Sequence, residues 1–174
     1  WVTAAQFSPD GGRVLLANSR GEFQVWSLPE AKPVIERDLR RGIEWAEFDA
    51  TGDRLLTVSD VVRIWNAHTG ELISDGIGHF DRITSAHFDP SGKTVVSYSG
   101  EHGQLWNLET GEPLEVALEH SAFIRTSAFN RTGDRLVTGS QDRTVRLWDV
   151  TSGEQVGDQL LHNGAVEFTA ILND

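Results

Sequence analysis

The chain has 174 residues, of which 15 are basic and 26 acidic, and it contains neither cysteine nor methionine. Its length suits one globular domain, and 39% hydrophobic with 24% charged residues disfavour both general disorder and a membrane span. A net charge of -11 disfavours nucleic acid and anionic membranes as partners, because both are bound through clustered Lys and Arg. The missing cysteines exclude disulfides, cysteine–zinc sites and cysteine nucleophiles, and they favour a reducing, cytoplasmic location.

Aromatic residues recur along the chain at a nearly constant spacing. One series of tryptophans has steps of 39, 41 and 42 residues, at Trp26, Trp65, Trp106 and Trp148. A series of phenylalanines has the same period, at Phe7, Phe48, Phe88 and Phe129. A glycine follows each of these phenylalanines four residues later. Three markers in one phase indicate internal repeats of about 40 residues.

Each repeat is predicted to form four short strands. The first strands end in turns such as Ser8-Pro9-Asp10-Gly11 and lie at residues 2–7, 43–48, 83–88 and 124–129. The second strands are apolar runs that suit burial on both faces, at residues 14–17, 55–58, 95–98 and 136–139. The third strands end at the marker tryptophans. A glycine turn in the last three repeats, and residues 28–33 in the first, then lead to a fourth, more polar strand, which ends near Leu39, Ile77, Leu118 or Leu160.

Four-stranded repeats of this length favour a β-propeller. A single small sheet has two apolar faces to cover, and stacking several sheets around an axis covers them. We therefore expect an all-β chain with four complete four-stranded antiparallel blades and the first strand of a fifth, over residues 166–171. The expected blade boundaries are residues 1–41, 42–80, 81–121, 122–163 and 164–174.

The start of the chain at Trp1 and the missing methionine suggest an excerpt or processed piece of a larger propeller. An open arc would expose the apolar faces of its end blades. We therefore expect association through the open blade edges, or through further blades of the full-length chain.

Short motifs carry a family resemblance. Gly78-His79 precedes the third repeat, and residues 140–149 read Ser-Gln-Asp-Arg-Thr-Val-Arg-Leu-Trp-Asp, ending in Trp148-Asp149. With these motifs the chain resembles the WD-repeat β-propeller family over its whole length. The resemblance implies a hydrogen-bonded network in the fourth blade, formed by His120, Thr138, Asp142 and Trp148. Such a network has a physical basis, because a buried indole N–H needs an acceptor and a carboxylate orients an imidazole.

The other repeats depart from this pattern. The third repeat has Gly100 and Glu101 where the Asp is expected, and it keeps a partial network of His79, Ser97 and Trp106. The second repeat has Arg41-Gly42 in place of the Gly-His pair, and it keeps Thr57, Asp60 and Trp65. The first repeat has Ala17, Arg20 and Trp26. We expect these three blades to rely mainly on packing.

The same residues also suit a catalytic interpretation. His120 oriented by Asp142 could activate the hydroxyl of Thr138, as in a hydrolytic triad, but the repeat spacing favours the structural network. No metal or cofactor is expected. The six histidines lack ligand spacing, and Asp81 stands where a dinucleotide fingerprint needs its third glycine. The innermost strands show isolated titratable residues without a recurring constellation, at Glu44, Glu47, His87 and Arg125.

The resemblance implies a partner-binding face formed by two sets of loops. These loops join the fourth strand to the next first strand, and the second strand to the third. The candidate residues are Arg41, Phe80, Arg82, Tyr98 and Phe123. Aromatic and Arg side chains are favoured interface anchors, although Phe80 and Phe123 could instead pack beside a neighbouring histidine.

Three functions follow from these observations. A non-catalytic scaffold that binds a protein or peptide is favoured. The alternative is a regulatory or sensing segment of a larger, signalling multidomain protein. A propeller enzyme with a site in its central channel is the least favoured, and neither nucleic acid nor a membrane is an expected partner.

Overall fold

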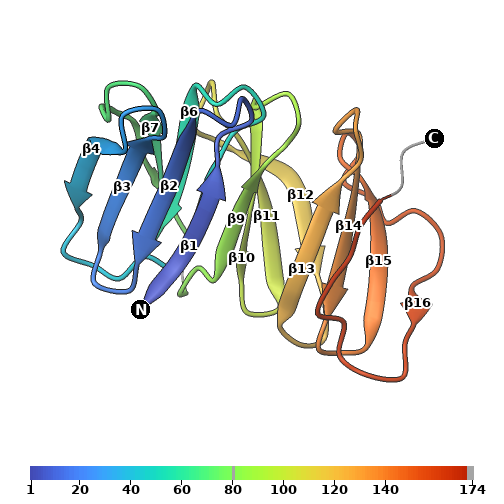
Figure 1. The fold of residues 1–174 in the computed structure, drawn as a ribbon. Helices are drawn as coiled ribbons and strands as arrows, with labels where there is room; N and C mark the ends of the chain where they lie inside the picture. The colour runs from blue at the N-terminus through green and yellow to red at the C-terminus, as the bar shows by residue number, and fades with distance from the viewer. Residues whose placement is uncertain (80, 172–174) are drawn as a thin grey trace. The chain divides into compact units, whose positions relative to one another are not determined.

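The computed structural model describes residues 1–79 and 81–171, and every regular element in these residues is a β-strand (Figure 1). The strands form four antiparallel sheets of four strands each, as expected for propeller blades. The chain divides into two units, residues 1–87 and 88–174. Within the described residues, no helix is long and apolar enough to cross a membrane.

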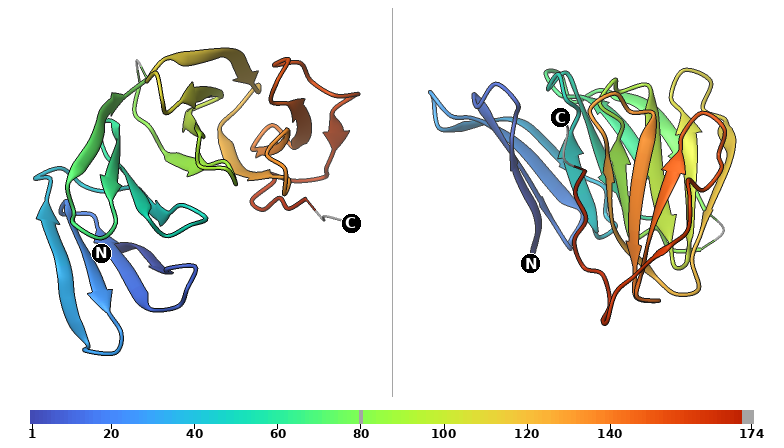
Figure 2. Two further views of the ribbon diagram at one scale, coloured as in Figure 1. Left: turned by 90° about the horizontal axis from the view of Figure 1, so that it is seen from above. Right: turned by 90° about the vertical axis from the view of Figure 1, so that its right-hand side faces the viewer.

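Each sheet is a run of antiparallel hairpins, so its strands lie side by side in chain order (Figure 2). The first sheet comprises β1 (Val2–Phe7), β2 (Arg13–Asn18), β3 (Glu22–Ser27) and β4 (Lys32–Asp38). The second comprises β5 (Trp45–Phe48), β6 (Arg54–Val58), β7 (Val62–Asn66) and β8 (Leu72–Ile77). The third comprises β9 (Ser85–Phe88), β10 (Thr94–Ser99), β11 (His102–Asn107) and β12 (Pro113–Glu119). The fourth comprises β13 (Ile124–Phe129), β14 (Arg135–Ser140), β15 (Thr144–Asp149) and β16 (Leu160–Leu161).

The turn after each first strand has the same local structure in all four sheets. In the second sheet the N–H of Gly52 donates to the carbonyl of Asp49 at 3.1 Å, and the Asp49 carboxylate accepts from the hydroxyl of Thr51 at 3.0 Å. Gly52 has a φ of 78°, a left-handed conformation that glycine adopts without a Cβ penalty. The other three turns repeat this backbone hydrogen bond and positive φ at Gly11, Gly92 and Gly133. The constant spacing from phenylalanine to glycine is therefore a consequence of turn geometry.

The second strands of three sheets are buried on both faces, as the apolar runs predict. Every residue after the first is buried in β6, β10 and β14. In β2 buried and half-buried residues alternate instead. The half-buried Leu16 and Asn18 border a hollow that Val2 and Glu22 also line, so one face of the first sheet is open within the first unit.

Each unit has its own apolar core. In the first unit this core joins the first two sheets through Leu15, Phe23, Ile43, Leu55 and Trp65. In the second unit a core cluster contains Val96, Tyr98, Leu105, Leu136 and Trp148. Tyr98 is 1% exposed, so this candidate partner-binding residue is a core residue and is not presented to a partner. Its ring lies against Gly103, where an added Cβ would come within 2.9 Å of ring carbons, because β10 turns this side chain inward.

The end of the described chain differs from the expectation. The fourth strand of the fourth sheet has only two paired residues, and residues 162–171 form no strand. A strand is defined by its hydrogen-bonded ladder, and no other described segment forms one with this stretch. The stretch instead packs on the fourth sheet, where the N–H of Val166 donates to the carbonyl of Ser140 at 3.0 Å.

Candidate functional site

A buried hydrogen-bonded network occupies the fourth sheet and joins all four residues that the sequence predicted for it. The indole N–H of Trp148 donates to Oγ1 of Thr138 at 2.8 Å, and Thr138 Oγ1 lies 2.7 Å from Nε2 of His120. Nδ1 of His120 lies 3.0 Å from Oδ2 of Asp142. The His120 side chain has no exposed surface, and that of Asp142 is 9% exposed.

The donors and acceptors of this network form one consistent chain. The Asp142 carboxylate can only accept, so the proton of a neutral His120 lies on Nδ1 and its Nε2 is an acceptor. The Thr138 hydroxyl then donates to Nε2 while its oxygen accepts from Trp148. Each polar hydrogen in the chain has a partner, and none remains for a substrate.

Neighbouring groups, which the sequence pattern did not single out, complete the network. The Thr144 hydroxyl donates to Oδ1 of Asp142 at 2.6 Å, and the N–H of Ser121 donates to Oδ2 at 2.9 Å. The Ser140 hydroxyl donates to the carbonyl of Ala122 at 2.9 Å and accepts from the N–H of Asp142 at 3.0 Å. A serine and a threonine on either side of an Asp in residues 140–144 are a signal for such a turn, because their hydroxyls can bond nearby backbone and carboxylate groups.

The network shifts the pKa values of both titratable members. Burial lowers the pKa of His120, although the hydrogen bond to Asp142 and its charge oppose this effect. Burial alone would raise the pKa of Asp142. The hydrogen bonds from Thr144, Ser121 and His120 outweigh burial and hold this pKa well below its usual range. At neutral pH the pair is therefore a neutral imidazole beside a carboxylate.

In two other sheets the tryptophan also bonds a hydroxyl. The indole N–H of Trp65 donates to Thr57 at 3.0 Å, and that of Trp106 donates to Ser97 at 2.8 Å. These bonds are more specific than the packing that the sequence led us to expect. His79, the remaining member of the partial network, is half-buried between β8 and β9.

In the first sheet the tryptophan donates to a glutamine side chain instead of a hydroxyl. Its β2 position is Ala17, which has no hydroxyl, and the indole N–H of Trp26 donates to the side-chain oxygen of Gln24 at 2.9 Å. Gln24 in turn donates to Glu36 at 2.9 Å. Gln24 lies two residues before Trp26 on the same strand, so both side chains face the same side of the sheet.

In the second sheet the acidic residue of the pattern pairs with arginines. Asp60 lies 2.9 Å from Nη1 of Arg63 and 3.3 Å from Nε of Arg41, a residue of the segment that replaces the Gly-His pair. Burial opposes ionisation of Asp60, but the hydrogen bonds from Arg63 and Ser59 lower its pKa to about 2. The Asp60 side chain is 40% exposed, so this charged cluster lies at the surface and leaves Thr57 and Trp65 as a separate pair.

The other predicted partner-binding residues have different environments. Arg41 is exposed and pairs with Asp60. Arg82 is exposed and donates to Glu44, a residue of an innermost strand in the sequence interpretation. Phe123 is 52% exposed, so it is not confined to packing beside His120. Phe80 lies outside the described residues.

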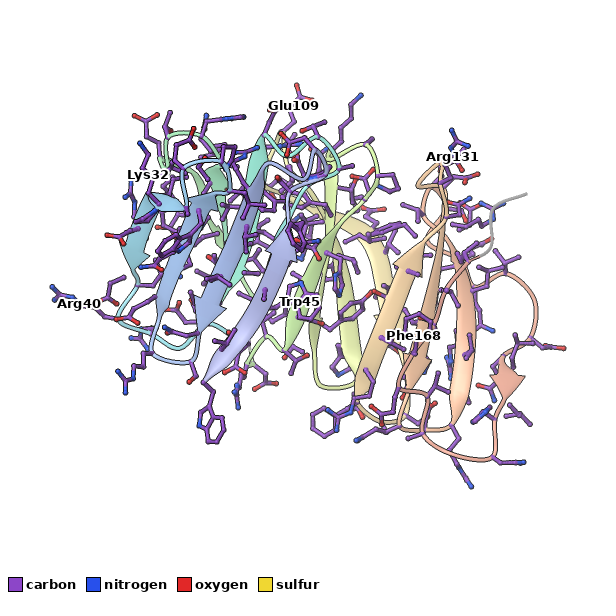
Figure 3. All side chains as sticks on the ribbon, viewed as in Figure 1. Lys32, Arg40, Trp45, Glu109, Arg131 and Phe168 are labelled. Carbon is purple, nitrogen blue, oxygen red and sulfur yellow. The ribbon has the colours of Figure 1, made fainter. Side chains whose placement is uncertain are left out.

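Two titratable residues that looked isolated in the sequence are in contact. Oε2 of Glu47 on β5 lies 2.9 Å from Nδ1 of His87 and accepts from the indole N–H of Trp45 at 3.0 Å. Figure 3 labels the side chain of Trp45. The rings of Trp45 and His87 meet edge to face, with centroids 5.0 Å apart. The signal was present in the repeats, because Glu47 and His87 each precede a marker phenylalanine. Gln6 has the same place in the first repeat, and its side-chain oxygen accepts from the N–H of Phe48 at 2.8 Å. This position therefore links neighbouring strands.

A second aromatic cluster lies at the start of β13. The guanidinium carbon of Arg125 lies 5.9 Å from the ring centroid of Phe123. The side-chain amide of Gln141, in the loop between β14 and β15, lies against the guanidinium of Arg125. Because both groups would otherwise present only donors to each other, the amide is assigned with its oxygen toward Arg125, where it accepts from Nε at 2.9 Å and from Nη2. Its backbone N–H donates to the carbonyl of Phe123 at 3.0 Å. The sequence analysis named Phe123 but did not connect it with Arg125 or Gln141.

An apolar hollow of about 320 Å³ lies on the fourth sheet. Its apolar lining comprises Val137, Val145, Leu147, Val156, Leu160 and Ile171. This hollow is an apolar surface on the last sheet of the chain, where association is expected, and association through it stays a prediction. Within residues 1–79 and 81–171, no group of three or more His, Asp or Glu side chains could hold a metal ion.

Comparisons with known proteins match this architecture. Residues 111–149 match the WD40 family, described as WD domain, G-beta repeat. The chain is 31% identical to protein tipD of Dictyostelium discoideum over 61% of the chain and 18% of that protein. It is 27% identical to apoptotic protease-activating factor 1 of Mus musculus over 100% of the chain and 17% of that protein. Over 41% of the chain it is 30% identical to WD repeat and SOCS box-containing protein 1 of Homo sapiens, of which 18% is covered. The chain thus spans less than a fifth of the length of these relatives.

Proposed function

Because the chain belongs to the WD-repeat family, we propose that it is a non-catalytic scaffold that binds a protein or peptide through its loops. The hydrogen-bonded sheets form the rigid part of this scaffold. The loops that follow the second and fourth strands carry the exposed groups, among them Arg41, Arg82 and Phe123. Rigid elements that present an exposed aromatic or Arg side chain suit the binding of a partner.

The observation that carries this proposal is the state of the His120 network. A hydrolytic triad needs a hydroxyl that is open to a substrate and a histidine that can take its proton. Thr138 is fully buried, and both its hydrogen and its oxygen are already used by His120 and Trp148. The three residues that could form a triad thus act as internal supports. This arrangement favours a structural role over a catalytic one.

We further propose that the chain is a regulatory segment of a larger cytoplasmic protein. The support is the short share of its relatives that it spans, together with their names. One relative joins WD repeats to a SOCS box by name, and another is named as a factor that activates a protease. In such proteins the repeats are one part of a longer chain.

Affinity capture with matched variants tests whether the exposed loop residues bind a partner. The whole chain serves as bait, and binding of each captured protein is then measured with the purified protein. Arg82→Ala combined with Phe123→Ala should weaken binding by about tenfold or more, as expected for interface anchors. Leu28→Ala combined with Lys93→Ala is the matched control, because it removes an exposed apolar and an exposed basic side chain from the opposite ends of the strands. Equal binding by both double variants would eliminate Arg82 and Phe123 as interface anchors.

A further inference from the structure

The Arg125 cluster is built differently from the other arginine sites. Arg125 and Phe123 flank the buried Ile124, and both are exposed at the start of β13. The ring of Phe123 lies over the guanidinium, and the side-chain oxygen of Gln141 holds Nε and Nη2. A planar guanidinium held on two sides loses little freedom when it binds a further group.

The guanidinium keeps its charge and three of its five donors. Gln141 is neutral, and in the described residues no carboxylate lies within ion-pair distance of Arg125. Arginine has five N–H donors, so the two that face Gln141 leave both hydrogens of Nη1 and one of Nη2. These remaining donors form a fork, which matches the two oxygens of a carboxylate. The nearby Asp142 does not fill it, because its oxygens accept from His120, Ser121 and Thr144.

Other arginines with comparable neighbours are already satisfied inside the chain. The guanidinium of Arg13 lies 5.5 Å from the ring centroid of Phe48, but Phe48 is 5% exposed. Arg13 donates to the carbonyls of Ala67 and Gly52, both at 2.7 Å. Arg82 has the carboxylate of Glu44 as its partner. Among these sites, Arg125 combines a held guanidinium with an exposed ring and with donors that face outward.

The ring of Phe123 adds an apolar surface next to the charge. Gly100 lies beside it, and an added Cβ there would be 3.7 Å from Cε1 of the ring. Because glycine has no side chain, this side of the ring stays open to a partner. A ligand with a carboxylate and a neighbouring apolar side chain would contact both the guanidinium and the ring.

We propose that Arg125, Phe123 and Gln141 form a receptor for an Asp or Glu side chain that has an apolar neighbour in a partner peptide. Arg125 binds the carboxylate through its outward fork, Gln141 positions Arg125, and Phe123 contacts the apolar neighbour. This proposal rests on the proposed scaffold function and names the chemistry of its partner.

Two matched peptide libraries test the proposal. In one library a fixed Asp or Glu is followed by a fixed Leu or Phe between randomised positions, and in the other Asn or Gln replaces the acid. Binding of each pool to the whole chain is measured at two salt concentrations, and we expect at least about tenfold preference for the acidic pool at the lower one. Arg125→Gln should abolish this preference, and Gln141→Ala should reduce it.

A matched control separates the receptor from bulk charge. Arg143 is an exposed arginine in the same loop as Gln141, so Arg143→Gln removes the same charge without touching the cluster. We expect Arg143→Gln to keep the preference. Arg125→Lys should keep part of it, because lysine retains the charge and loses the fork. Far-UV circular dichroism and thermal melting of each variant establish that it folds.

Each outcome has a distinct meaning. Equal loss in the Arg125→Gln and Arg143→Gln variants would overturn the carboxylate receptor. Tighter binding of a third library, which carries phosphoserine at the fixed acidic position, than of the acidic pool would also overturn it. Unchanged acidic preference in Arg125→Gln would do the same. In all these cases partner capture by the wild-type chain would leave the scaffold function standing. A wild-type chain that captures neither peptides nor proteins would count against the scaffold function itself.

Discussion

The second and fourth sheets bury the same pair of residues and support it in different ways. In both, a tryptophan at the end of the third strand donates to a threonine on the second strand, at 3.0 Å for Trp65 and 2.8 Å for Trp148. In the fourth sheet the threonine continues through His120 to a nearly buried Asp142. In the second sheet the acid is Asp60, which is partly exposed and pairs with arginines.

The difference shows that the tryptophan–threonine bond does not depend on the rest of the network. Where a buried histidine follows the threonine, the carboxylate must also be buried and fully bonded, because an unpaired buried polar group is costly. In the second sheet, where Arg41-Gly42 replaces the Gly-His pair, the acid pairs with Arg41 and Arg63 at the surface. The two repeats thus differ in where their charged groups lie.

Removal of the two acids should give the largest difference in stability between the fourth and second sheets. Asp142→Ala leaves His120, Thr144 and the N–H of Ser121 without their acceptor, so we expect a loss of about 3–5 kcal/mol in the free energy of unfolding. Asp60→Ala is the matched change in the second sheet and should cost about 0–1 kcal/mol, because its partners are solvated. Chemical denaturation of both variants measures the two values. Similar losses at both positions would show that the two acids have equivalent roles.

Removing the two hydroxyls should give a smaller contrast. Thr138→Val keeps the volume but removes the partner of both Trp148 and His120, and it should cost about 2–3 kcal/mol. Thr57→Val removes the partner of Trp65 alone and should cost about 1 kcal/mol. Denaturation curves in urea provide the measurement. A larger loss for Thr57→Val than for Thr138→Val would mean that the surface cluster of Asp60 depends on Thr57 more than the hydrogen bond to Trp65 indicates.

The pH dependence of stability should give the smallest difference between the two sheets, and it concerns the His120–Asp142 pair of the fourth sheet. The folded pKa of His120 is lowered, so the unfolded chain binds a proton more readily and the stabilisation is complete only above the unfolded value of about 6.5. We expect stability to fall as the pH drops below this value, and to fall further below about 4 as Asp142 becomes protonated. Melting temperatures between pH 8 and pH 5 test this. The same slope in a folded His120→Gln variant would assign it to another group.

Local sequence patterns predicted much of the fold because they report local physics. The glycine after each marker phenylalanine reflects a backbone conformation that other residues adopt at a cost, as Gly52 shows. The apolar runs identified strands that are covered on both faces, such as β14. The four residues of the His120 network could be assigned to one network because their order and spacing match the pattern of WD repeats.

Contacts between repeats and the directions of individual side chains could not be predicted in this way. Glu47 and His87 are far apart in sequence, and only the packing of β5 beside β9 brings their atoms to 2.9 Å. Tyr98 was expected near a loop face, but the direction of its side chain on β10 makes it part of the core. Gln24 took the role of a missing hydroxyl because it shares a face of β3 with Trp26.

The sequence by itself determined the four repeats, their strands and turns, and the residues of the His120 network, because periodicity and backbone preference act over a few residues. Only the tertiary structure decided which of these side chains are exposed, because exposure depends on the strand or loop that packs alongside. The direction of its side chain on β10 buries Tyr98, whereas Arg125 and Phe123 stay exposed and lie beside Gln141 of a neighbouring loop.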